Sequence, residues 1–232
     1  LPKTTLIICP TSVLATWLSQ ISQHVCDGYL NVLLYHGSNR NTNPDVLKNY
    51  DIILTSYGTV NHEFRSLTEN GSSSSNNNNN GGMNGNKKRK HGASSSSSQG
   101  LFALNYHRVV LDEAHMIRNR NTKCHKAVLN LKSTNRWCLT GTPLQNKAED
   151  MQSLFAFLKC KPINEFKVWK RSIGRLIKDG DELGLARLRV FVRSICLRRS
   201  KSLLVDKLPE RTIELHSLEM DGQQKTIYDE LF

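Results

Sequence analysis

The sequence predicts an α/β fold in which a parallel sheet carries helices on both faces. Short, nearly continuous apolar runs recur along the chain, as in strands that are buried on both faces. Amphipathic stretches alternate with these runs and have the spacing of surface helices. The chain has 232 residues, of which 38% are hydrophobic, so it is long enough for one sizeable domain.

The first expected strand covers residues 6–9 and leads into a helix. One face of that helix is marked by apolar residues at helical spacing, namely Val13, Leu14, Trp17, Leu18 and Ile21. Thr11 or Ser12 is expected to cap the helix, because a hydroxyl oxygen can accept a hydrogen bond from the free N–H groups of its first turn.

Four more strands are expected at residues 30–35, 51–55, 108–111 and 136–139, and a helical pattern between residues 124 and 131 separates the last two. The three tryptophans, Trp17, Trp137 and Trp169, lie in apolar or amphipathic stretches and are expected in the core. Because parallel sheets bind ligands at the carboxyl ends of their strands, the residues that follow these runs form the candidate site.

Residues 70–100 interrupt the predicted domain. Nine Ser, eight Asn and six Gly fill 23 of the 31 positions. A segment of this composition cannot bury enough apolar surface to fold, so we expect a disordered insertion. It contains four consecutive basic residues, 87–90, which indicate either a nuclear-import signal or a charged run that keeps a polar loop soluble.

The chain is strongly basic, with 32 Lys and Arg against 20 Asp and Glu and a net charge of +12. Residues 159–207 alone hold 14 basic and five acidic residues. This excess predicts a polyanionic partner such as nucleic acid, held mainly through its phosphates. The alternative is an ordinary solvated helix face. No apolar run approaches the roughly 20 residues that span a bilayer, so a membrane protein or membrane partner is not predicted.

Two acids follow the expected strand at residues 108–111. Asp112 and Glu113 precede Ala114 and His115, which places two carboxylates and an imidazole at the end of a buried strand. Such placement is costly unless a cation joins the acids. A hydrated magnesium ion held by Asp112 and bridging nucleotide phosphates explains the first acid, and Glu113 can then activate an attacking water. The alternative is a strand that simply enters a polar turn.

The strand at residues 136–139 leads into small hydroxyl residues and a glycine, Thr140, Gly141 and Thr142. At the same sheet edge, these hydroxyls and amides can sense a phosphate site and relay its state. Alone, the segment looks like any turn between a strand and a helix.

In this order, the motifs resemble the SWI/SNF-type helicase-like ATPases of helicase superfamily two. The matching stretches are LIICPTSVLATW (6–17), ILTSY (53–57), DEAH (112–115), LTGTPLQN (139–146) and LRRSK (197–201). Three further stretches look most like the transcription termination factor 2 branch: LLYHGSNR (33–40), LFAFLKCKPINEFKVW (154–169) and KLPERTIELHSLEM (207–220). The helicase-like transcription factor and the Rad-type repair translocases are near neighbours.

The resemblance implies a RecA-like first ATPase lobe over residues 1–200, interrupted by the insertion at 70–100, and an inter-lobe linker with the start of a second lobe over residues 201–232. It also implies ATP and Mg²⁺ as cofactors, double-stranded DNA as partner and the nucleus as location. The phosphate loop pattern G-x-x-x-x-G-K-[ST] is absent from this sequence. We therefore expect an excerpt that is inactive alone and belongs to an active parent protein.

The resemblance assigns roles to individual residues as well. Asp112 matches the magnesium-coordinating acid, which acts through water, and Glu113 matches the water-activating acid. His115, the third residue of the catalytic set, matches a residue that couples nucleotide state to DNA, as do Thr140, Gly141 and Thr142. The DNA-contacting positions are Pro10, Thr11, Ser12, Thr55, Ser56, Tyr57, Arg198 and Arg199.

Three functions stay open at this point. The first is a translocase on duplex DNA that displaces bound proteins, with stalled RNA polymerase or chromatin proteins as candidate targets. The second is a repair translocase whose parent also carries a RING ubiquitin-ligase module. The third is an inactive DNA-binding scaffold, against which the intact Asp112 and Glu113 argue.

Overall fold

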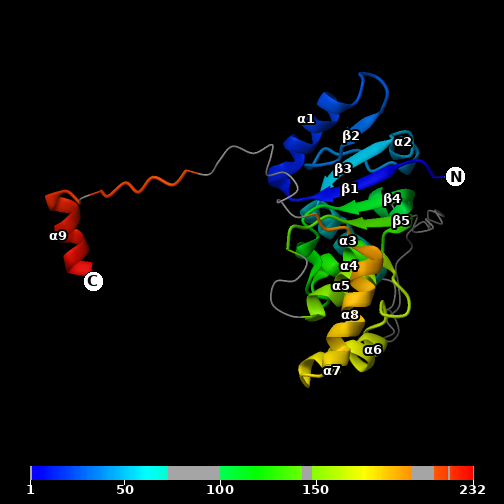
Figure 1. The fold of residues 1–232 in the computed structure, drawn as a ribbon. Coiled ribbons are helices and arrows are strands. Elements are labelled where there is room, and N and C mark those ends of the chain that lie inside the picture. Colours follow the sequence, from blue (N-terminus) through cyan, green and yellow to red (C-terminus); the bar gives the residue numbers. More distant parts are fainter. Residues whose placement is uncertain (1, 73–99, 143–147, 200–211, 219, 232) are drawn as a thin grey trace, which may run out of the picture. The chain divides into compact units, whose positions relative to one another are not determined.

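The computed structural model describes residues 2–72, 100–142, 148–199, 212–218 and 220–231 (Figure 1). Contacts divide the chain into two units, Leu1–Arg189 and Val190–Phe232. Most of the predicted insertion, with its basic run at 87–90, lies outside the described residues, and so do residues 143–146 of the LTGTPLQN stretch.

The first unit is built on one sheet of five parallel strands in the order β2-β3-β1-β4-β5. In the central strand, Ile8 pairs with Thr55 on one side and Leu111 on the other. The strands are β1 (Thr5–Cys9), β2 (Val32–Leu34), β3 (Ile52–Ser56), β4 (Asn105–Leu111) and β5 (Lys132–Cys138). Each overlaps an expected strand, so the predicted parallel sheet is confirmed.

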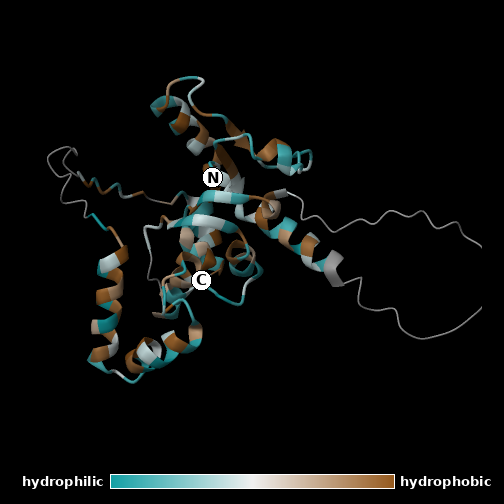
Figure 2. Cartoon of the chain, turned by 90° about the vertical axis from the view of Figure 1, so that its right-hand side faces the viewer, coloured by the Kyte–Doolittle hydropathy of each residue, from teal (hydrophilic) through white to brown (hydrophobic). Residues whose placement is uncertain are grey.

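Helices cover both faces of this sheet (Figure 1). Helix α1 (Leu14–His24) packs on one face, against a buried cluster of Ile7, Cys9, Leu54 and Val110. Successive strand residues point to opposite faces, so buried neighbours such as Ile8 face the other side. The helices grouped on that side are α3 (Tyr57–Ser72), α4 (Lys123–Leu129) and α5 (Ala148–Leu158). Apolar and polar residues alternate along α1, in agreement with its one partly buried face (Figure 2).

The start of α1 differs from the prediction. Residues Thr11–Val13 form a short 3-10 turn, and neither Thr11 nor Ser12 caps a helix through its side chain. The N–H of Val13 instead donates to the carbonyl oxygen of Pro10 at 3.1 Å. The predicted cap is therefore wrong, because the 3-10 turn satisfies the entering backbone and leaves both hydroxyls exposed.

The prediction of a disordered insertion over residues 70–100 is wrong at its two ends, because residues 70–72 belong to helix α3 and Gly100 belongs to a 3-10 turn. Helix α3 continues to Ser72, and a 3-10 turn (Gly100–Ala103) begins the next described segment. Gly100 is buried, has a φ of +67° and donates its N–H to the carbonyl oxygen of Thr42 at 2.9 Å. A Cβ at this position would lie 2.5 Å from Glu63 Oε2, so only glycine fits here.

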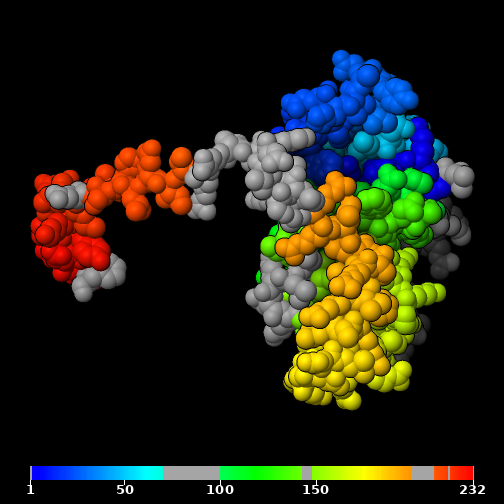
Figure 3. All heavy atoms as spheres, viewed as in Figure 1, coloured from blue at the N-terminus to red at the C-terminus, as the bar shows by residue number. Residues whose placement is uncertain are grey.

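The remaining elements of the first unit lie mostly after the sheet. They are α2 (Pro44–Leu47), α6 (Phe166–Trp169), a π-helical turn (Lys170–Gly174), α7 (Arg175–Lys178) and α8 (Glu182–Ile195), which runs into the second unit. The region of α6–α8 (yellow to orange in Figure 3) carries exposed bases, among them Lys167, Lys170, Arg171, Arg175, Lys178, Arg187 and Arg189. The predicted basic surface is present in this region.

The second unit contains the end of α8 and helix α9 (Gly222–Leu231). Among the described residues of both units, no helix combines the length and apolar character needed to cross a membrane.

Candidate active site

The carboxyl ends of β1, β3, β4 and β5 lie along one edge of the sheet, where the predicted motifs follow. Strand β4 ends at Leu111 and delivers Asp112, whose N–H donates to the carbonyl oxygen of Ile8 on β1 at 2.8 Å. Asp112 therefore starts next to the central strand, because the last rung of the ladder holds its backbone in place.

Asp112 is half-buried and accepts hydrogen bonds from three directions. Trp17 Nε1, on α1, donates to Oδ2 at 2.8 Å, and the N–H of Glu113 donates to Oδ1 at 2.9 Å. The hydroxyl of Tyr57, at the start of α3, donates to the main-chain oxygen of Asp112 at 2.7 Å. Each carboxylate oxygen accepts one of these bonds and keeps a lone pair for a further donor or a cation.

Glu113 has the left-handed backbone conformation, with φ and ψ both 50°. A residue with a side chain adopts this conformation at a cost of about 1–2 kcal/mol, and such strain concentrates at functional sites. The Glu113 side chain is 45% exposed, and its Oε2 lies 3.0 Å from His115 Nδ1 without hydrogen-bond geometry. The second carboxylate is therefore presented at the edge of the sheet, beside an imidazole.

Main-chain hydrogen bonds join the segment after β5, which begins at Leu139, to the loop that carries Asp112 and Glu113. The N–H of Leu139 donates to Leu111 O at 2.8 Å, and the N–H of Ala114 donates to Leu139 O at 2.9 Å. Immediately beyond, the N–H of Thr142 donates to Thr140 Oγ1 at 3.2 Å, and Gly141 is exposed. The structure thus places the predicted coupling residues next to Asp112 and Glu113.

A buried histidine on α4 forms a hydrogen bond with the main chain of the turn that follows Asp112 and Glu113. His125, on α4, is 3% exposed, and its Nδ1 donates to the carbonyl oxygen of Ile117 at 3.0 Å. Burial lowers the pKa of His125 from its ordinary value of 6.5. The neutral ring therefore belongs to the folded state.

A pH dependence follows from this histidine. The folded pKa lies below the unfolded one, so between the two values the unfolded chain binds more protons and the folded state loses stability as the pH falls. We expect the melting temperature to fall between pH 7.5 and pH 5.5, and to fall less in a His125→Gln variant. An equal loss in both proteins would show that His125 does not contribute.

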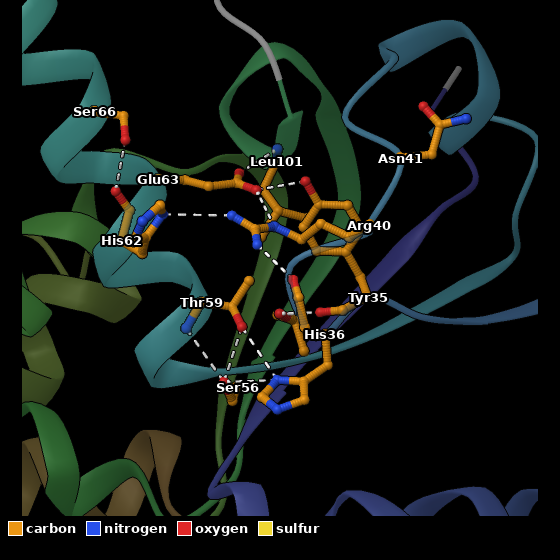
Figure 4. A network of polar contacts seen from close by, with 12 residues as sticks. Tyr35, His36, Arg40, Asn41, Ser56, Thr59, His62, Glu63, Ser66 and Leu101 are labelled. Atoms are coloured by element: carbon orange, nitrogen blue, oxygen red, sulfur yellow. Dashed lines mark hydrogen bonds and ion pairs between the residues drawn. The ribbon is translucent and has the colours of Figure 1, made fainter.

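Thr55 and Ser56 are buried, so their hydroxyls are not accessible at the protein surface. The two residues are 0% and 2% exposed. Thr55 Oγ1 donates to Tyr35 O at 2.8 Å, and Ser56 Oγ accepts the N–H of Thr59 at 3.2 Å (Figure 4). Tyr57 is also buried and is directed to Asp112. The structure therefore gives this motif internal partners and does not support direct contact between these side chains and DNA.

The other predicted DNA-contacting residues are accessible. Pro10 is half-buried, and Thr11 and Ser12 are exposed directly after β1. Arg198 and Arg199 belong to the second unit and are exposed there.

Trp17 is the residue of the site that the sequence pattern does not reveal. Because Trp17 lies on the apolar stripe of α1, the sequence predicts a core residue. The pattern gives no sign that its indole N–H donates a hydrogen bond to Asp112. The available signal is topological, because the helix that follows a central strand starts at the edge where the neighbouring strand delivers Asp112.

Burial keeps the thiols of Cys9 and Cys138 and the phenol of Tyr57 neutral at this edge. It raises the pKa of the Cys9 thiol to about 11, with the charge of Asp112 adding to the effect, and that of Cys138 to about 12. Burial also raises the pKa of Tyr57, which remains a donor at neutral pH. The reactive groups of the edge are therefore its carboxylates and not its thiols.

The donor set fits a magnesium ion that is shared with a nucleotide. Among the described residues, no group of three or more His, Cys, Asp and Glu forms a metal cage. Magnesium commonly takes one or two carboxylates and fills its other positions with water and phosphate oxygens. The free lone pairs of the Asp112 carboxylate suit this mode of binding, directly or through water.

The SNF2-related domain model matches residues 2–232. The chain belongs to this family. Its fold is similar to the Sulfolobus solfataricus SWI2/SNF2 ATPase core in complex with dsDNA, with a TM-score of 0.65 and 28% identity, over 90% of this chain and 36% of that one. The predicted RecA-like fold class and the SWI/SNF resemblance are confirmed.

Curated SNF2 relatives carry transcription and repair names. The human helicase-like transcription factor is 37% identical over 98% of this chain, the DNA repair protein rad5 of Aspergillus fumigatus 35% over 100%, and the Drosophila melanogaster transcription termination factor 2 31% over 97%. The chain spans only 18–20% of the length of these three proteins. Identity to the termination factor is the lowest of the three, so these values do not single out its branch.

Proposed function

We propose that the full-length protein containing this chain is a DNA-dependent ATPase that couples hydrolysis to movement on duplex DNA. The observation that carries this proposal is the geometry of the two acids. Asp112 is fixed by donors from α1 and from its own loop, whereas Glu113 is turned outward by a strained backbone. One anchored and one accessible carboxylate suit the two roles of metal ligand and general base.

In this proposal Asp112 holds Mg²⁺, which neutralises developing charge on the ATP phosphates when bound. Glu113 orients the attacking water and accepts its proton. His115, whose Nδ1 lies 3.0 Å from the Glu113 carboxylate, is the third member of the proposed catalytic set. The segment of Thr140, Gly141 and Thr142, joined to the acidic loop through Leu139 and Ala114, relays the nucleotide state to neighbouring structure.

Duplex DNA is the proposed second ligand. The exposed bases of α6–α8 supply a positive surface for phosphates, and the exposed hydroxyls of Thr11 and Ser12 can donate to phosphate oxygens. Arg198 and Arg199 add positive charge in the second unit. The Sulfolobus SWI2/SNF2 core, whose structure holds dsDNA, supports the same ligand class.

The domain limits and the cellular role are also proposals. We propose that residues 1–200 form a first ATPase lobe whose phosphate loop lies upstream, and that residues 201–232 lead into a second lobe. The names of the relatives support a role in transcription or repair. We propose further that the protein works in the nucleus by displacing bound proteins such as RNA polymerase or chromatin proteins. Termination and repair remain alternatives within one motor reaction.

The test is ATP hydrolysis by the full-length protein, measured with and without duplex DNA at several salt concentrations. We expect turnover that rises on addition of DNA and loses this stimulation at high salt, because phosphate contacts release counterions. DNA binding without turnover would contradict the motor and leave a binding scaffold.

A further inference from the structure

We propose that Trp17 is a positioning residue that orients the Asp112 carboxylate for the magnesium nucleotide. This inference rests on the proposed function, and it adds a residue outside the acidic motif to the machinery of hydrolysis. Its starting point is the 2.8 Å hydrogen bond from Trp17 Nε1 to Asp112 Oδ2, which joins residues 95 positions apart.

The indole ring is held firmly enough to act as an orienting group. Trp17 is half-buried and packs against the cluster of Ile7, Cys9, Leu54 and Val110 under α1. A packed ring has few alternative rotamers, so its N–H points in a fixed direction. The packing energy of α1 thereby fixes the position of a donor at the sheet edge.

The carboxylate needs this donor because its other described donor is local. The N–H of Glu113 holds Oδ1 from within the same loop, and Tyr57 holds the main-chain oxygen of Asp112 and not the carboxylate. Without the indole N–H, Oδ2 loses its described protein partner and the carboxylate can rotate. Groups that orient a metal ligand in this way typically contribute tenfold or more to metal affinity or activity.

The same bond joins two parts of the proposed motor. Trp17 lies on the helix that begins just after Thr11 and Ser12, the accessible predicted DNA-contacting residues. A displacement of α1 therefore reaches the Asp112 carboxylate through one side chain.

The experiment uses the full-length protein and a fluorescent, non-hydrolysable ATP analogue. The Mg²⁺ concentration for half-maximal binding of the analogue is measured for the wild type, Trp17→Phe, Trp17→His and Trp137→Phe. Trp17→Phe keeps an aromatic ring but removes the N–H, and Trp17→His retains a ring N–H on a smaller, less apolar side chain. Trp137→Phe removes an indole N–H from a side chain that is 55% exposed and serves as the matched control.

We expect Trp17→Phe to raise the half-saturating Mg²⁺ concentration about tenfold, while affinity for the analogue in EDTA and the melting temperature change little. Trp17→His is expected to recover part of the loss, and Trp137→Phe to match the wild type. A structural role would give the opposite order, because Phe replaces the packing of Trp better than His does. Equal losses in both Trp17 variants, or no loss in Trp17→Phe, would overturn the proposal.

The wild type separates this inference from the proposed function. A wild-type protein that hydrolyses ATP, with a Trp17→Phe variant of unchanged Mg²⁺ dependence, sinks only the role of Trp17. A wild type that shows no magnesium-dependent binding of the analogue sinks the proposed function, and the role of Trp17 with it. If Trp17→Phe does not fold, Trp17→His is compared with Trp17→Leu, which has no ring N–H. A smaller rise of the half-saturating Mg²⁺ concentration in the His variant than in the Leu variant supports the proposal, and equal values in the two variants overturn it.

Discussion

Replacement of Glu113 by glutamine is expected to reduce DNA-stimulated ATP hydrolysis by the full-length protein by about 10²- to 10⁴-fold, the usual contribution of a general base. The amide keeps the shape of the side chain but cannot accept a proton from water. The Glu113 carboxylate is 45% exposed and its described partner is His115, so the substitution breaks no buried network. Nucleotide binding, DNA binding and the melting temperature are therefore expected to persist.

Two comparisons make the Glu113 result specific. Glu182→Gln, which changes an exposed acid at the start of α8, is expected to hydrolyse ATP at the wild-type rate. Asp112→Asn is expected to lose hydrolysis together with magnesium-dependent nucleotide binding, because the proposed metal ligand is weakened. Turnover within a few-fold of the wild type in Glu113→Gln would remove Glu113 from the reaction.

The sheet is predictable because its strands are buried on both faces. Continuous apolar runs such as residues 6–9 are typical of parallel strands that are covered on both faces of the sheet. The apolar pattern predicts strand β5 only at residues 136–139, since its first half, KSTN, is polar. As an edge strand it pairs on one side with β4 and tolerates polar residues, which by hydropathy alone resemble a loop.

The three tryptophans show that an apolar or amphipathic sequence stretch does not by itself predict how deeply a side chain is buried. Trp169 is fully buried as expected, but Trp137 is 55% exposed, with the Arg108 guanidinium 5.9 Å from its ring centre. Trp17 is only half-buried and donates to Asp112. Apolar neighbours in sequence locate a side chain on an element, whereas its exposure depends on what packs over that element.

The site is predictable as a set of motifs but not as a set of contacts. Strand ends at one edge explain why Asp112 and Thr140 lie near each other. The burial of Thr55 and Ser56 could not be predicted, because it depends on Tyr35 and Thr59 as hydrogen-bond partners. Hydroxyl residues in a motif can contact a ligand or hold the backbone that presents it, and only the packed structure distinguishes these roles.

A buried carboxylate joins the two described segments that flank the predicted insertion. Glu63, on α3, accepts hydrogen bonds from the hydroxyl of Tyr35, from Arg40 Nε at 3.0 Å and from the N–H of Leu101 at 2.9 Å (Figure 4). The side chains of Glu63 and Arg40 are only 8% and 15% exposed. Leu101 follows the insertion in sequence and α3 precedes it, so one carboxylate anchors both sides.

The hydrogen bonds of Glu63 fix the backbone between the predicted insertion and the strands that carry the candidate active site. The backbone on both sides is fixed at Glu63, and Gly100 makes room for the carboxylate because a Cβ there would collide with it. The entropic cost of a longer loop between two fixed ends grows only slowly with its length. We therefore expect changes in the length or composition of residues 73–99 to leave β3 and β4, which carry the predicted motifs, in place.

Replacement of Glu63 by alanine is accordingly expected to destabilise the domain by about 3–5 kcal/mol, as when one partner of a buried ion pair is removed. Arg40 would keep a half-buried charge, and the Tyr35 hydroxyl and the Leu101 N–H would lose their acceptor. The change is measured as the melting temperature of the full-length protein and as faster hydrogen exchange in residues 57–69 and 100–106.

The matched control for Glu63 is Glu69→Ala on the same helix. Glu69 pairs with Arg65 at 3.4 Å, but the two side chains are 67% and 57% exposed, and water screens such a pair. Its loss is expected to change stability by no more than about 0.5 kcal/mol. Similar effects for the two glutamates would show that the buried network does not hold the insertion ends. A large effect of Glu63→Ala alone would show that burial, and not the number of ion pairs, decides what a charge contributes to this fold.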